Sequence, residues 1–61
     1  MIVTIQKWKK KVDWSVDYDS EPIVKKIHGS NAADCMASVL MERNYNDLTK
    51  YTPVEIISIE D

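Results

Sequence analysis

The sequence has few of the residues that small proteins use to hold themselves together or to carry out chemistry. Its 61 residues include one cysteine, one histidine and one glycine, and no phenylalanine. One cysteine cannot form an internal disulfide, and with a single histidine it cannot complete a zinc site of four protein ligands. One glycine is too few for the glycine-rich loops that cradle phosphates and dinucleotides. We therefore expect no metal and no cofactor.

Long apolar runs and catalytic motifs are missing as well. No stretch approaches the roughly 18 apolar residues of a membrane-spanning helix, and no signal-peptide core follows Met1. Metalloprotease motifs and nucleophile elbows are absent, and the sequence places no nucleophile or carboxylate near His28. We expect a cytoplasmic protein with no membrane contact, no catalytic residues and no enzymatic activity.

What the chain does have is the composition of a small globular domain, with 44% hydrophobic residues and a net charge of −2. Residues 1–61 predict a single domain, at a size where folding buries only about 60% of the surface of the unfolded chain. Domains this small often need a disulfide, a metal or a second copy to complete the core. Because the first two are excluded, the sequence predicts a homodimer.

Residues 30–44 carry the only sustained helical periodicity. The wider apolar stripe of this helix is predicted to lie on a sheet, and it consists of Ala33, Met36, Ala37, Leu40 and Met41. A smaller stripe, made of Ala32, Cys35 and Val39, lies roughly opposite, and Met36 joins the two. We expect this smaller stripe to face outward and to be covered by the second copy.

Four further segments have strand character. Residues 2–8, 12–18 and 54–60 are rich in β-branched or aromatic types. Residues 23–28 predict a shorter strand, either separate or continuing 12–18 after a kink at Pro22. Both faces of 54–60 are apolar, which suits a central strand or a sheet whose outer side is also covered. The order predicts an α+β fold, ββ(β)αβ, in which one helix packs across an antiparallel sheet of three or four strands.

Charges of opposite sign follow one another in the first third of the chain. Four lysines, Lys7, Lys9, Lys10 and Lys11, precede four carboxylates, Asp13, Asp17, Asp19 and Glu21. On a strand, same-face side chains lie about 6.6–6.8 Å apart, close to two base-pair steps along DNA, about 6.8 Å. The four carboxylates are therefore candidate contacts for a basic protein surface, by mimicry of a phosphate track. An ordinary solvated strand face is the alternative.

The element order and the acidic hairpin resemble the small dimeric uracil-DNA glycosylase inhibitors of phi29-like Bacillus phages. The resemblance includes the entry into the helix at His28 and Gly29, Asp34 near its start, and the isoleucine-rich last strand. It implies a dimer whose hydrophobic cleft captures an apolar side chain of the glycosylase. The implied cleft is lined by Cys35, Met36 and Val39, with Glu42 and Tyr45 at its rim. The family carries aromatic residues on its helix, whereas this helix is aliphatic up to Tyr45.

These observations predict a non-enzymatic phage-type inhibitor that pairs with itself and blocks a host DNA-processing enzyme. The most specific target is host uracil-DNA glycosylase in the host cell cytoplasm, bound by DNA mimicry together with the hydrophobic cleft. The element order is also similar to HicB-type antitoxins. A small nucleic-acid-binding accessory protein is a further alternative, because the lysine cluster, Trp8 and Arg43 could combine phosphate contact with stacking. The carboxylates argue against direct nucleic-acid binding, since they repel a polyanion.

Overall fold

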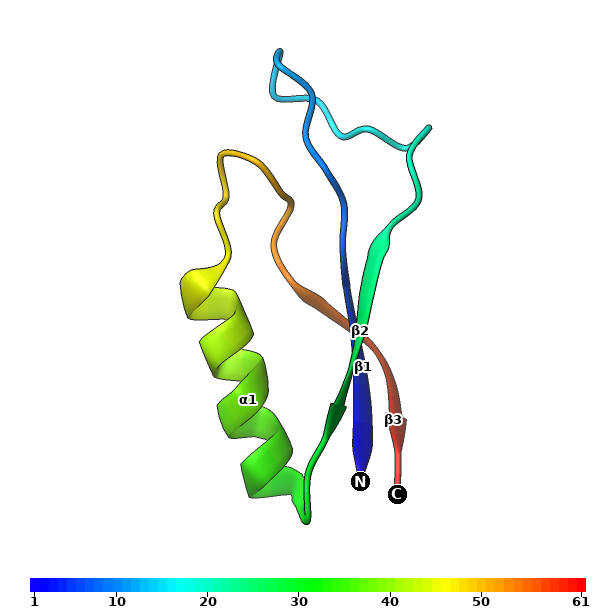
Figure 1. Cartoon of the computed structure of the whole chain (residues 1–61), viewed down its shortest axis with the longest axis vertical. Helices are drawn as coiled ribbons and strands as arrows, with labels where there is room; N and C mark the ends of the chain where they lie inside the picture. Colours follow the sequence, from blue (N-terminus) through cyan, green and yellow to red (C-terminus); the bar gives the residue numbers. More distant parts are fainter.

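The computed structural model describes residues 1–61 (Figure 1). Its elements are β1 (Ile2–Lys7), β2 (Ile23–His28), α1 (Ala32–Tyr45) and β3 (Glu55–Glu60). The strands form one antiparallel sheet in the order β2-β1-β3, and α1 packs along one face of β1 and β2. The predicted α+β fold is therefore confirmed, with the order ββαβ. Residues 23–28 form a strand of their own.

The central strand of the sheet is β1. Val3 pairs with Ile27 on one side and with Ile59 on the other, so these three side chains share the face on which α1 lies. Of the two alternatives for 54–60, the central strand is wrong, because β3 lies at an edge. A bulge in the β1–β3 ladder, where Ile5 pairs with Ile56, leaves Ile57 without a partner and half exposed.

The predicted strand at 12–18 does not form. Trp14 has a φ of 71°, a left-handed conformation that interrupts an extended chain. Its amide donates to the Lys11 carbonyl at 3.0 Å, which closes a turn. Val12 is fully exposed and only an isolated bridge, from Lys10 to Val16, pairs this region. Residues 8–22 therefore form a long loop between β1 and β2 (Figure 1), because no second layer covers the apolar side chains of the segment.

The helix is capped at both ends by asparagine. The Asn31 side chain accepts a hydrogen bond from the Asp34 amide at 3.0 Å, and the Asn46 amide donates to the Arg43 carbonyl at 3.3 Å. At 14 residues, α1 has neither the length nor the apolar run needed to cross a membrane. The predicted helix at 30–44 is thus confirmed to within two residues at its start and one at its end.

The orientation predicted for the helix is wrong. Cys35 and Val39 are fully buried against the sheet, where they complete a hydrophobic core with Val3, Ile5, Ile27 and Val54. The wider stripe faces away from the sheet, and its Leu40 is 52% exposed. The close approach of helix and sheet explains why the Cys35 side faces inward. Cys35 packs directly over Gly29, and a Cβ on Gly29 would lie 2.7 Å from the Cys35 Sγ atom.

This contact predicts that Gly29→Ala destabilises the protein by about 1–3 kcal/mol, because the added methyl group forces the helix away from the sheet. Urea unfolding followed by circular dichroism measures the change. Cys35→Ala in the same chain removes the clashing sulfur, so the double variant should lose less stability than the sum of the two single variants. Additive losses would show that Gly29 and Cys35 are not in contact.

Candidate protein-binding surfaces

The outer side of α1 carries an apolar strip that the fold leaves uncovered. We call it the outer stripe, and it consists of Ala33, Met36, Ala37, Leu40 and Met41, all of them exposed. At 100° per residue, the charged side chains Asp34 and Arg43 flank the outer stripe and do not interrupt it. Contiguous exposed apolar surface of this kind is a candidate site for contact with another molecule.

The cleft implied by the resemblance is not formed by its expected residues. Cys35 and Val39 are fully buried within the single chain and cannot line an accessible cleft, whereas Met36 is 41% exposed. Glu42 makes an ion pair with Lys25 of β2, and Tyr45 extends into solvent. Of the five helix residues expected at the cleft, only Met36 and Tyr45 are exposed and free of a partner within the chain.

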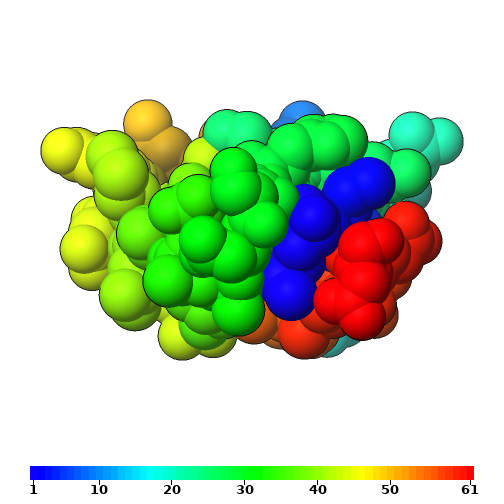
Figure 2. All heavy atoms as spheres, turned by 90° about the horizontal axis from the view of Figure 1, so that it is seen from below, coloured from blue at the N-terminus to red at the C-terminus, as the bar shows by residue number.

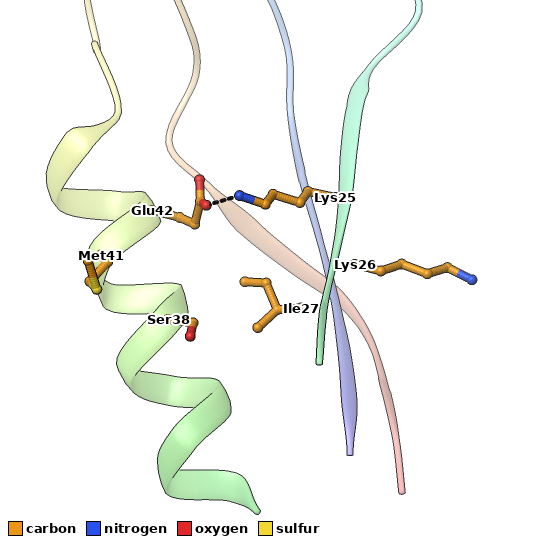
Figure 3. A pocket seen from close by; sticks show the side chains of 6 residues that line it. All are labelled: Lys25, Lys26, Ile27, Ser38, Met41 and Glu42. Carbon is orange, nitrogen blue, oxygen red and sulfur yellow. Dashed lines mark hydrogen bonds and ion pairs between the residues drawn. The ribbon is translucent and has the colours of Figure 1, made fainter. Parts of the chain in front are cut away.

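A hollow of ≈ 310 Å³ lies instead between α1 and β2, where the ion pair crosses from helix to strand (Figure 3). Ser38 and Met41 line it from the helix, and Ile27 forms its floor. Figure 3 shows Lys26 pointing away from the helix. The hollow therefore has an apolar floor with one neutralised charge pair at its rim, and it adjoins Met41 of the outer stripe.

The four candidate carboxylates lie in the loop 8–22, at the end of the molecule opposite the start of α1 (Figure 1). One Asp13 oxygen accepts hydrogen bonds from the Ser15 hydroxyl at 2.6 Å and the Ser15 amide at 3.1 Å. Asp17 accepts one from the Asp19 amide at 3.2 Å. Asp13 and Asp17 therefore each accept hydrogen bonds from within their own turn. Without a strand, the phosphate-like spacing predicted for Asp13, Asp17, Asp19 and Glu21 does not exist, although all four lie at the surface.

Sequence reasoning missed a contact between two distant loops. The Lys10 amide donates to the Lys50 carbonyl at 2.9 Å, and Lys9 forms a bridge with Tyr51. Trp8 and Thr52 exchange two further bonds, at 2.9 and 3.0 Å. No periodicity in residues 46–53 predicts this pairing, which brings Lys50 beside the lysines of the first loop.

Groups suited to metal binding are not gathered anywhere in the protein: no three His, Cys, Asp or Glu side chains are placed to share an ion.

Comparison with known proteins gives no family assignment, since no family model, no curated protein and no solved structure matches the chain. Functional proposals therefore rest on the fold, on the surfaces described above and on the resemblance stated for the sequence.

Asp13 and Asp47 occupy matching turns in the two loops. The Ser15 hydroxyl and then its amide hold the pKa of Asp13 below its ordinary value of 3.8, and nearby Lys11 adds to the effect. The Thr49 hydroxyl and amide lower the pKa of Asp47 in the same way, aided by Lys50. Because the folded pKa is depressed, the stabilisation of each turn is present above pH 3.8 and is lost as the pH falls through the folded value.

The matched turns predict a reciprocal pair of NMR titrations. Ser15→Ala should raise the pKa of Asp13 toward 3.8 and leave that of Asp47 unchanged. Thr49→Ala should do the reverse, because each hydroxyl donates only within its own turn. If either substitution moves neither pKa, the turns are not formed in solution.

Proposed function

We propose that this chain works by binding other proteins and not by catalysis, with the outer stripe of α1 as its main apolar contact. The observation that carries the proposal is a charge-free, exposed helix face on a chain whose core holds only six hydrophobic residues. A core of that size leaves a 61-residue domain marginally stable. Covering the outer stripe adds the apolar burial that the isolated chain lacks.

The first proposed partner is a second copy of the chain. A compact monomer of this mass has an accessible surface of about 4,100 Å², whereas this chain exposes 4417 Å². Its radius of gyration is 12.5 Å, against about 10.5 Å for a compact domain of its length. The single chain is thus more extended and more exposed than a self-sufficient domain, which supports association.

Charge favours the outer stripe over the sheet edges as the interface between copies. Two β2 strands paired antiparallel would bring Lys25 and Lys26 of each copy together, and two β3 strands would oppose Glu55 and Glu60. The outer stripe carries no charge, and two-fold symmetry makes it complementary to itself. Small side chains at Ala33 and Ala37 let two helices approach closely. The proposed interface is thus opposite to the Cys35 side expected from the sequence.

The second proposed partner is a DNA-processing enzyme with a basic surface, which the dimer blocks. Surface carboxylates at Asp13, Asp17, Asp19 and Glu21 support it by complementing positive charge and speeding encounter. A dimer carries two such loops and gains avidity where both engage. Uracil-DNA glycosylase of the host is the specific target that we propose, following the resemblance of the sequence to its phage inhibitors.

The dimer is tested by placing a charge in the outer stripe. Leu40→Glu should convert a particle of twice 7.1 kDa into a folded single chain, because a buried unpaired carboxylate is costly. Sedimentation equilibrium measures the mass and circular dichroism the folding.

Val24→Glu is the matched control, because Val24 is equally exposed, at 51% against 52%, but points away from α1. It should remain dimeric. A wild-type mass of one chain, or a Leu40→Glu variant that stays dimeric, would remove the dimer.

The target is tested by adding the protein at an equimolar ratio to uracil-DNA glycosylase and measuring uracil excision. We expect excision to fall. Asp19→Lys should weaken the inhibition by roughly tenfold or more if this carboxylate meets a basic surface. Glu55→Lys, an equal charge change on the exposed edge of β3, should not. Undiminished excision would eliminate this target.

A further inference from the structure

The lysines of the first loop and Lys50 gather around one hollow that the proposed function does not use. It measures ≈ 310 Å³, and its lining contains Lys9, Lys10, Lys11 and Lys50 together with Val12, Thr49 and Tyr51. The pairing of residues 8–10 with 50–52 forms it, because this pairing places two segments about 40 positions apart side by side. Four lysines from two loops therefore line one space, and no carboxylate lines it.

Most of these ammonium groups have no anionic partner. The single ion pair of the protein lies elsewhere, between Lys25 and Glu42. Lys10 donates to the Leu48 carbonyl at 2.8 Å, which fixes its position without neutralising it. Asp13 and Asp47 lie close enough to Lys11 and Lys50 to feel their charge, but each directs an oxygen into its own turn. Two carboxylates against four lysines leave the hollow net positive.

An aromatic side chain stands beside the hollow in an unusual conformation. Trp14 is 63% exposed, although a tryptophan is usually among the best-covered residues of a small protein. Its φ of 71° is rare for a bulky residue and points to a functional constraint. The Lys10 ammonium lies 5.7 Å from the centroid of the Trp14 ring, within cation–π range. A flat, exposed ring thus lies next to Lys10, one of the lysines that line the hollow.

Asp17 adjoins the lysines, because its amide donates to the Lys9 carbonyl at 2.9 Å. The lysines belong to the half of the loop that leaves β1 and runs beside residues 47–52 (Figure 1). Asp17, Asp19 and Glu21 belong to the half that returns to β2. Residues 9–10 pair with the returning half on one side and with residues 50–51 on the other. Salt screening shortens the reach of the flanking carboxylates.

We propose that the lysine hollow and Trp14 bind single-stranded nucleic acid. The lysines contact consecutive phosphates, and the Trp14 ring stacks on an unpaired base. Lysines act as point charges and carry no base readout, so the binding is independent of sequence. The exposed ring needs a base that is free of a duplex, which selects single strands. The proposal is independent of the outer stripe and of any inhibited enzyme.

The two tryptophans of the chain, Trp8 and Trp14, both belong to the loop 8–22, which makes intrinsic fluorescence a direct probe. Titration with a 20-nucleotide oligothymidine at low salt should quench it. Three lysines without other partners predict a slope of about −2 for log K against log salt, at about −0.7 per phosphate on a single strand. A duplex of equal length should bind more weakly, because it offers no base for stacking.

Variants are compared by the anisotropy of a labelled oligothymidine. Lys50→Glu should weaken binding by roughly tenfold and lower the salt slope by about 0.7, and Trp14→Ala should remove the preference for single strands. Lys26→Glu, on the sheet face turned away from α1, is the control with the same charge change and should bind like the wild type.

The proposal is overturned if oligothymidine leaves the fluorescence unchanged. It is also overturned if Lys26→Glu weakens binding as much as Lys50→Glu, or if polyglutamate binds as tightly as oligothymidine. That last result would assign the hollow to acidic proteins. Circular dichroism confirms that each variant is folded. Because none of these substitutions touches Leu40, the result is separate from the fate of the dimer.

Discussion

The contact of Cys35 and Val39 with the sheet determines which surfaces the molecule exposes. These two side chains are the part of α1 that is completely buried, and they pack on Val3, Ile5 and Ile27 beside the unsubstituted backbone of Gly29. The two apolar stripes lie on roughly opposite sides of α1, so burying the narrower stripe against the sheet leaves the wider stripe in solvent. The space-filling view from below shows α1 as an outer layer beside the strands (Figure 2). The outer stripe is a direct consequence of this choice.

The far end of the molecule obeys a different constraint. Here backbone hydrogen bonds join two loops, Asp13 and Asp47 each close a turn within their own loop, and almost no apolar side chain is buried. Such a region is shaped by local polar contacts and is free to expose aromatic and charged groups. Long loops without strands or helices usually have a function. The molecule thus separates an exposed apolar surface along α1 from a charged surface at the loop end.

The bounds of β1, β2, α1 and β3 follow closely from the sequence, because each segment carries its own propensity, periodicity or cap. Two of the wrong predictions, the strand at 12–18 and the inward face of the helix, have clear physical causes. The alternation in residues 12–18 is that of a strand, but alternation specifies only which side would be buried, and the chain supplies neither a partner nor a second layer to bury it. The turn at Trp14 and the hydrogen bond from the Lys10 amide to the Lys50 carbonyl determine the path of the chain instead.

The helix was assigned the wrong inward face because its wide stripe contains more apolar surface. Packing also depends on shape, and the small Cys35 side chain fits over Gly29 while Glu42 reaches Lys25 of β2. Neither contact can be read from periodicity, since Gly29 and Lys25 lie outside the helix. The same limit applies to the candidate sites. The exposed carboxylates were visible in the sequence, whereas the lysine hollow depends on Lys50, which only the pairing of two loops brings into place.

Labelling of Cys35 with a water-soluble thiol reagent tests the central claim most directly. The measurement belongs at dilutions where the protein is a single chain, so that protection by a second copy plays no part. If Cys35 packs against the sheet, the native thiol stays unreacted over a period in which the urea-unfolded chain reacts completely. Reaction of the native, single chain at the rate of the unfolded one would place Cys35 on the outer side of the helix and contradict the account.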